Sequence, residues 1–85
     1  MDSLTFKPGD ALLASNSRVV PWRVVFEDEG GAGYLYACDR SWPKQEQSIL
    51  DAMLIYNVRS LQDPERERLA AVQWSQDGMQ ALFYI

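Results

Sequence analysis

The sequence predicts an α+β fold, in which a small antiparallel sheet of four or five strands, built from two hairpins, packs one main helix on one face. Alternating apolar runs on either side of a glycine-rich turn predict the first hairpin, and a second pair around Asp77-Gly78 predicts the other. Apolar residues at helical spacing between positions 49 and 54 predict the helix. With 85 residues, 47% of them hydrophobic, the chain is expected to form a single domain over 1–85.

The first 18 residues carry the weakest pattern. Pro8-Gly9-Asp10 predicts a turn and residues 15–18 predict a polar loop, because both are rich in turn-forming residues. Residues 11–14 between them predict a short strand.

The first hairpin is predicted from residues 19–26 and 33–39, which are rich in β-branched and aromatic side chains. Pro21 cannot donate a ladder hydrogen bond, so it is expected at a strand start or on an edge strand. Residues 28–32 join the two runs with turn chemistry, since glycine adopts positive φ without steric cost.

The second half begins with the predicted helix, over about residues 47–54 or starting near Pro43. Residues 55–58 predict a short extended piece, and Asp63-Pro64-Glu65 predicts the start of one or two further helical turns. The last hairpin turns at Asp77-Gly78; a two-residue turn of the primed type there requires positive φ at Gly78. Its final strand reaches Ile85 and is apolar on both faces.

Composition argues against several classes of function. The formal net charge is −4, and the eight basic residues are scattered, which disfavours nucleic-acid and anionic-membrane partners. The chain has no histidine and a single cysteine, Cys38, so the usual pairs for nucleophilic catalysis are missing. We therefore expect a protein that is not an enzyme and has no cofactor. No secretory signal pattern and no apolar run of about 20 residues is present, which predicts a cytoplasmic location.

The acidic residues before the first turn are the candidates for a metal site. Glu27, Asp28 and Glu29 offer carboxylate oxygens, but adjacent acids point to opposite sides of an extended chain. We interpret them as a solvated hairpin tip whose charges protect a sheet edge, and expect no bound metal.

Three segments carry a family resemblance: "VVFEDEGGAGYLYACD", "ILDAMLIYNV" and "VQWSQDGMQALFYI". Together they resemble a family of small uncharacterised bacterial proteins, over about half of the chain. That family continues past the last hairpin with a further short apolar segment, whereas this sequence ends at Ile85. Short proteins of this kind are also similar to those carried on mobile gene cassettes. The resemblance implies no activity.

The aromatic residues, 12% of the chain, provide two hypotheses for function. The first is a non-enzymatic interaction protein that self-associates as a dimer or higher homo-oligomer through its C-terminal strand, at Leu82, Phe83, Tyr84 and Ile85. An inhibitor or immunity-type role fits its size and acidity. The alternative is a small-ligand-binding module whose pocket is lined by Tyr34, Tyr36, Trp42 and Tyr56.

Overall fold

The computed structural model of the chain describes residues 1–41 and 48–85. Within these residues it contains strands, one short 3-10 turn and no α-helix, so the predicted α+β class is wrong and the fold is all-β. No helix in the described part is long and apolar enough to cross a membrane. The elements are β1 (Asp2–Phe6), β2 (Ala11–Asn16), β3 (Trp22–Asp28), β4 (Ala32–Asp39), β5 (Ser48–Asn57), η1 (Val58–Ser60), β6 (Arg68–Trp74) and β7 (Ala81–Tyr84).

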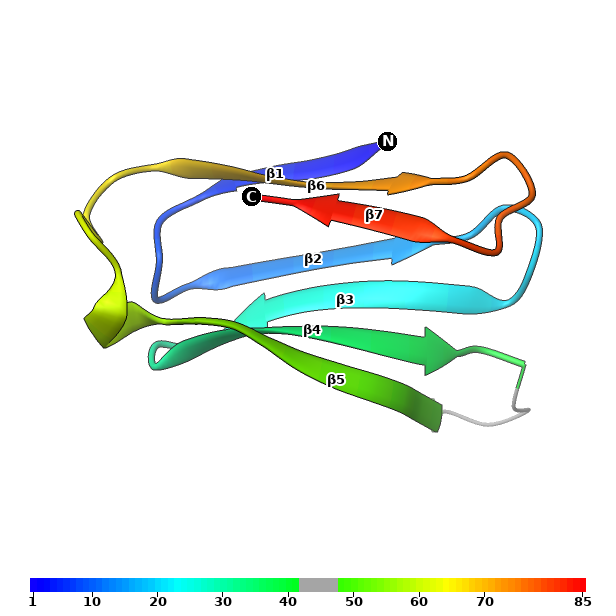
Figure 1. The fold of residues 1–85 in the computed structure, drawn as a ribbon, viewed down its shortest axis with the longest axis horizontal. Helices are drawn as coiled ribbons and strands as arrows, with labels where there is room; N and C mark the ends of the chain where they lie inside the picture. Colours follow the sequence, from blue (N-terminus) through cyan, green and yellow to red (C-terminus); the bar gives the residue numbers. More distant parts are fainter. Residues whose placement is uncertain (42–47) are drawn as a thin grey trace.

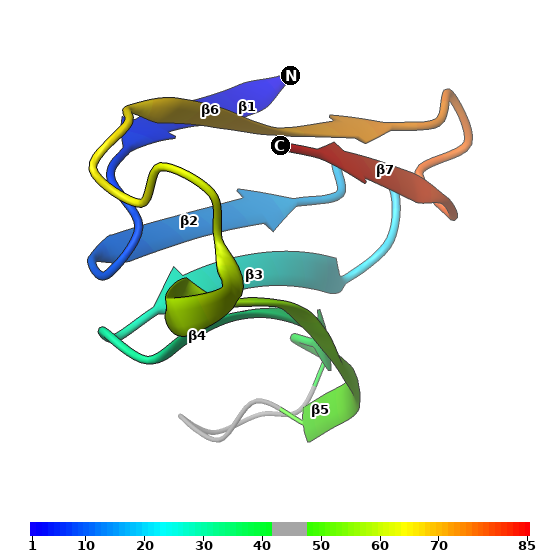
Figure 2. The same ribbon diagram turned by 60° about the vertical axis from the view of Figure 1, so that its left-hand side comes forward.

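The described strands form two antiparallel sheets rather than the one sheet of four or five strands that was predicted. One sheet has the order β1-β6-β7 and the other the order β2-β3-β4-β5. Figures 1 and 2 show the three-stranded sheet above the four-stranded one; the edge strands are β1 and β7 in the first sheet and β2 and β5 in the second. A tight turn, closed by a bridge between Lys7 and Asp10, leads from β1 into β2 and so from one sheet into the other.

The core lies between the two sheets and is centred on Phe26 of β3, which is fully buried. Its ring centroid lies 5.3 Å from that of Phe6 in β1 and 5.2 Å from that of Phe83 in β7. These contacts hold the inner faces of both sheets together, as in other β-sandwiches. The buried members of the cluster are Phe6, Ala11, Leu13, Val24, Phe26, Ala70 and Val72.

The predicted helix over 47–54 is the largest error of the sequence analysis. From residue 48 onward this segment is β5, paired with β4 from Asp39 to Ala32, while residues 43–47 lie outside the described part. The run is apolar at both helical and alternating positions, so periodicity alone does not decide its structure. Strand β4 decides it, because its outer backbone groups need a partner and β5 supplies the hydrogen bonds.

Other differences between the predicted and observed elements are smaller, and two of them also arise from the pairing of one strand with another. β1 was not predicted at all, and it forms because it pairs with β6, from Asp2 opposite Val72 to Phe6 opposite Arg68. β2 extends through Asn16 into the predicted polar loop because it pairs with β3. The predicted helical turns after Asp63 are absent, since Asp63 has a φ of 56°, and the short helical turn is η1 instead.

Both predicted hairpins are present, as the pairs β3–β4 and β6–β7. The turn of the second is wider than the predicted two-residue turn, because the Ser75 N–H donates to the Gln80 carbonyl at 2.8 Å across a four-residue loop, 76–79. The Gly78 N–H donates to the Ser75 carbonyl at 3.0 Å. Gly78 has a φ of 72°, so the predicted need for positive φ is confirmed.

Candidate functional site

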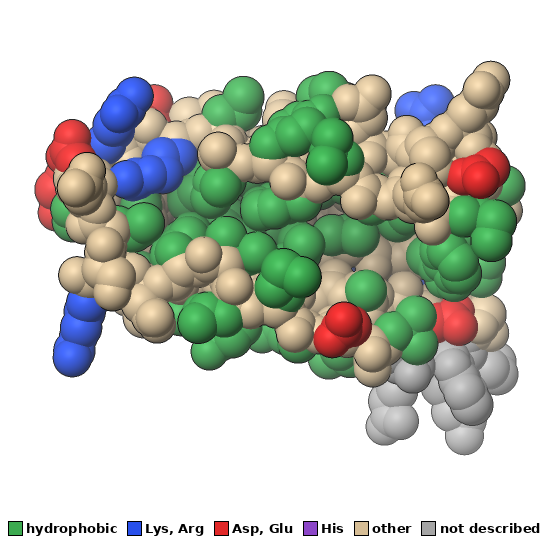
Figure 3. Space-filling model, in the orientation of Figure 1, with side chains coloured by type: hydrophobic (Ala, Val, Ile, Leu, Met, Phe, Trp, Pro, Cys, Tyr) green, Lys and Arg blue, Asp and Glu red, His purple; other side chains and the backbone are tan. Residues whose placement is uncertain are grey.

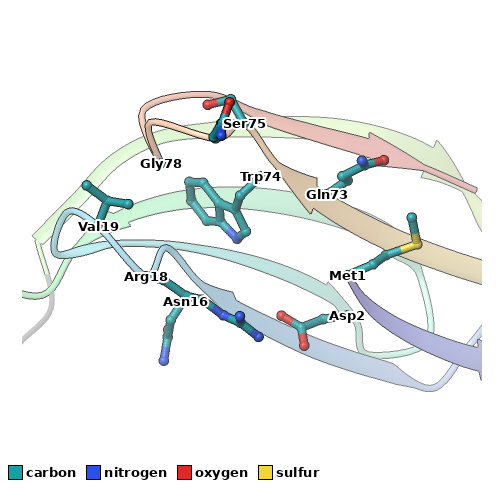
Figure 4. A pocket seen from close by; sticks show the side chains of 10 residues that line it. Met1, Asp2, Asn16, Arg18, Val19, Gln73, Trp74, Ser75 and Gly78 are labelled. Carbon is teal, nitrogen blue, oxygen red and sulfur yellow. The ribbon is translucent and has the colours of Figure 1, made fainter.

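A pocket of about 350 Å³ opens at one end of the sandwich, where β1, β2, β6 and the loop after β6 meet. Figure 4 shows the Trp74 indole at its centre, with Arg18 and Asp2 below the ring and Val19 to one side. We call it the Trp74 pocket. It is lined by Met1, Asp2, Asn16, Arg18, Val19, Gln73, Trp74, Ser75, Gln76 and Gly78.

A buried serine fixes the position of the indole. Ser15 of β2 is 1% exposed and points inward, in line with the core residues of its strand. The Trp74 Nε1–H donates to Ser15 Oγ at 2.9 Å, and the Ser15 hydroxyl donates to Asp2 Oδ2 at 2.5 Å. Because this chain joins β6, β2 and β1, the aromatic wall and the carboxylate of the pocket are held by the fold itself.

A second buried serine fixes the rim of the Trp74 pocket. The Ser17 hydroxyl donates to the Gly78 carbonyl at 2.8 Å and accepts the backbone N–H groups of Val19 and Val20, at 3.2 and 3.3 Å. The loop after β2 and the loop after β6 are therefore tied together, and the pocket is preformed between them.

Removing the first serine tests this network. We expect Ser15→Ala to lower the free energy of unfolding by about 1–3 kcal/mol, because the part-buried Trp74 indole N–H then loses its acceptor and the Asp2 carboxylate loses its donor. Urea denaturation followed by tryptophan fluorescence measures it. Ser3→Ala, at an exposed position of β1, is the matched control and should leave the midpoint unchanged; equal midpoints for the two variants would contradict the assigned network.

At the opposite end of the sandwich, the acidic turn is organised around a buried carboxylate. Asp28 is 2% exposed, so its interpretation as part of a solvated tip is wrong, whereas Glu29 is exposed as predicted. Asp28 Oδ2 accepts the Gly9 N–H at 2.7 Å and the Tyr56 hydroxyl at 2.5 Å, and Oδ1 accepts the Gly30 N–H at 2.9 Å. One side chain therefore joins two turns and β5.

The pKa values of this pair follow from burial and from those hydrogen bonds. Burial raises the pKa of Asp28, but hydrogen bonds from the Tyr56 hydroxyl and from two backbone N–H groups outweigh it and hold the pKa below its ordinary value. Burial, together with the bond to the Asp28 carboxylate, raises the pKa of Tyr56 well above its ordinary value. All donors are used within the protein, so we assign this cluster a structural role.

The aromatic residues predicted to line a ligand pocket do not form one group. Tyr34 and Tyr36 stack on the outer face of β4, with ring centroids 6.1 Å apart. Tyr56 points to the inner face, where its ring lies 6.2 Å from that of Phe26. Trp42 lies outside the described residues.

The predicted interface residues lie together on β7 and just after it. Leu82 and Tyr84 are on the outer face and are 58% and 38% exposed, whereas Phe83 points inward and is half-buried. Ile85 follows the strand and is 51% exposed. Figure 3 shows hydrophobic side chains gathered in a strip on the face that lies between β7 and β5 in Figure 1.

Two further candidates can be placed. Cys38 is buried, and burial raises the pKa of its thiol although Arg23 lowers it, which does not favour a nucleophilic thiolate. Across residues 1–41 and 48–85, no group of three or more acidic or cysteine side chains is arranged to hold a metal ion.

The sequence analysis missed the Trp74 pocket. It assigned residues 15–18 to a polar loop and gave Trp74 no role in a site. The available signal was the alternation from Ala11 through Leu13 to Ser15 and Ser17, which places two serines at core positions. A buried serine needs a hydrogen-bond partner, so this pattern indicates a polar network between the sheets.

A profile of uncharacterized proteins conserved in bacteria, designated DUF2251, matches residues 6–85. The chain belongs to the DUF2251 family. This confirms the resemblance to uncharacterised bacterial proteins, while the suggested link to mobile gene cassettes stays a prediction. The match includes β2 to β7 and most residues of the Trp74 pocket.

One relative is a protein of Haemophilus influenzae described as an uncharacterized protein. It is 37% identical to this member of the DUF2251 family over 62 residues, which are 73% of this chain and 37% of the relative. The match therefore spans little more than a third of the relative's length. No solved structure matches the chain.

Proposed function

We propose that this chain is a non-enzymatic interaction module that self-associates through β7. The occupant of the surface is a second copy of the chain, and β7 of each copy pairs antiparallel with β7 of the other about a two-fold axis. The observation that carries the proposal is the free edge of β7, which lacks the usual protection of an edge strand. Its four residues include no charge and no proline, and its pairing with β6 is regular.

Side-chain burial supports the same surface. Leu82 and Tyr84 on the outer face and Ile85 beyond the strand expose apolar area, and a copy of β7 alongside would place its own side chains beside them and cover part of that area. A groove of about 490 Å³ lies at this end of β7, lined by Arg66, Glu67, Arg68, Leu69, Ala71, Tyr84 and Ile85.

A cytoplasmic location is part of this proposal. Its support is that the chain has a single cysteine, Cys38, whose thiol is buried, whereas proteins of oxidising compartments are commonly rich in disulfides.

The oligomeric state tests the proposal. We expect light scattering coupled to size exclusion to give about twice the 9.7 kDa chain mass for the unmodified protein. The proposed register places Leu82 beside Leu82 of the other copy at the axis, so Leu82→Asp and Leu82→Lys should each give monomers because like charges then meet. Mixing the two variants should restore dimers, since opposite charges then face each other.

Leu12→Asp is the matched control. Leu12 is 64% exposed and lies on β2, in the other sheet, so this variant should remain a dimer. Thermal denaturation of every variant shows that each is folded. A chain mass near 9.7 kDa for the unmodified protein, or dimers of Leu82→Asp alone, would refute self-association through β7.

A further inference from the structure

The Trp74 pocket combines an aromatic surface with two opposite charges. The Arg18 guanidinium and the Asp2 carboxylate both line it, and Figure 4 shows them converging below the Trp74 indole. Its volume of about 350 Å³ lies at the small end of the range for small-molecule sites. None of the residues that line the pocket belongs to β7, although Gln73 and Trp74 pair with Leu82 and Ala81 of that strand.

The two charged groups offer different contacts to a ligand. Arg18 is exposed and presents a planar fork of N–H donors that matches a carboxylate. Asp2 already accepts the Ser15 hydroxyl on Oδ2, which orients its carboxylate and leaves Oδ1 to accept from a ligand. A ligand that is only anionic is repelled by Asp2, and one that is only cationic is repelled by Arg18.

Apolar contacts in the pocket come from Trp74 and Val19. The indole is held by its hydrogen bond to Ser15, and its ring faces the pocket. Val19 lies on the same rim and is 63% exposed. A ligand that joins a carboxylate and an ammonium to a small apolar body meets all three surfaces at once.

From this arrangement we propose that the Trp74 pocket binds a free α-amino acid as its zwitterion. The ligand carboxylate pairs with Arg18, the ligand ammonium pairs with Asp2, and an apolar side chain packs against Trp74. The site requires no metal and no group outside the chain.

The hydrogen-bonded chain from Trp74 to Asp2 provides a specific readout. The Trp74 indole N–H donates to the Ser15 hydroxyl, which in turn donates to the Asp2 carboxylate. An ammonium bound to that carboxylate therefore alters both hydrogen bonds. The resonance of the Trp74 Nε1–H should therefore shift in a ¹H–¹⁵N spectrum, whereas the resonance of the Trp22 indole on β3 should not. Trp74→Phe assigns the resonance.

The probes are glycine, L-leucine and L-phenylalanine, each titrated at neutral pH. We expect a saturable shift of the Trp74 indole resonance with at least one of the apolar amino acids. Phenethylamine lacks the carboxylate of L-phenylalanine and 3-phenylpropionate lacks its ammonium; each should bind at least about tenfold more weakly than L-phenylalanine. No saturable shift with any of the three amino acids, or equal binding of L-phenylalanine and either analogue, would overturn the proposal.

Two exposed substitutions test the assignment of the charges. Arg18→Gln should weaken binding of L-phenylalanine by at least about tenfold but should not weaken binding of phenethylamine, because phenethylamine has no carboxylate and is freed from the repulsion of Arg18. Asp2→Asn keeps an acceptor for Ser15 and should weaken binding of L-phenylalanine but not binding of 3-phenylpropionate, which has no ammonium and is freed from the repulsion of Asp2. Arg59→Gln, at an exposed arginine of η1, is the control and should bind as the unmodified protein does. Variants of Arg18 and Asp2 that bind L-phenylalanine normally would refute the site.

Discussion

Replacing Gly78 with valine is expected to lower the free energy of unfolding by on the order of 3–5 kcal/mol. Gly78 has a φ of 72°, which a β-branched residue adopts only under strain. A Cβ added there would also lie 2.5 Å from Ser17 Oγ and 2.6 Å from Val19 Cβ, closer than atoms approach without movement. The strain therefore reaches the rim of the Trp74 pocket as well as the hairpin turn.

The loss is large relative to the whole domain. A chain of this length has a total stability of about 4–13 kcal/mol, so Gly78→Val removes a large part of it. Gly31→Ala is the matched control, because Gly31 has no atom within 4 Å of an added Cβ and does not adopt positive φ. Urea denaturation of both variants measures the difference. Equal midpoints would show that the turn of the last hairpin differs from the one described.

Asp28→Asn is expected to lower the free energy of unfolding by about 3 kcal/mol near neutral pH. The carboxylate accepts three hydrogen bonds, from Gly9, Gly30 and Tyr56, and a neutral amide satisfies fewer of these donors while bringing two of its own. Because these bonds join both turns and β5, the loss affects the packing of the two sheets.

The effect of Asp28 depends on pH in a defined direction. Its pKa in the folded protein is lowered, so its stabilisation is present above the unfolded pKa of about 3.9 and is lost as the pH falls through the folded pKa. The unmodified protein should therefore lose stability more steeply than Asp28→Asn as the pH falls below about 4. Denaturation midpoints measured from pH 7 to pH 2 check this. Asp10→Asn, an exposed acid at the same end, is the control, and parallel profiles for all three proteins would contradict the assigned role of Asp28.

Tyr56→Phe separates the contribution of the Tyr56 hydroxyl from that of the backbone hydrogen bonds to Asp28. It removes the hydroxyl that Asp28 accepts but keeps the ring against Phe26, so a smaller loss, of about 1–2 kcal/mol, is expected. A loss as large as that of Asp28→Asn would place most of the stabilisation in the single bond to Tyr56.

Part of the candidate site could be predicted from the sequence. The apolar character of residues 81–85 on both faces predicted an incompletely covered final strand, and Leu82 and Tyr84 are indeed exposed on its outer face. The Trp74 pocket was not predicted, because its residues come from β1, β2, β6 and two loops. Such a grouping depends on the pairing of Asp2 with Val72, 70 positions away.

The amino-acid sequence by itself determined the features that depend on neighbouring residues. Both hairpins and the positive φ of Gly78 follow from short runs of alternating side chains and from glycine's freedom of φ. Family membership also rests on the sequence alone.

Only the tertiary structure decided whether residues 48–57 form a helix or a strand, and where Asp28 lies. The apolar side chains of that segment suit either element, and the unpaired backbone of β4 selects the strand. The acidic residues around Asp28 predicted a solvent-exposed hairpin tip. Asp28 is nevertheless buried, because Gly9 and Tyr56, 19 and 28 positions away in the sequence, donate hydrogen bonds to it. Hydrogen-bond partners that distant leave no local signal, so burial of the carboxylate is a property of the packed sheets.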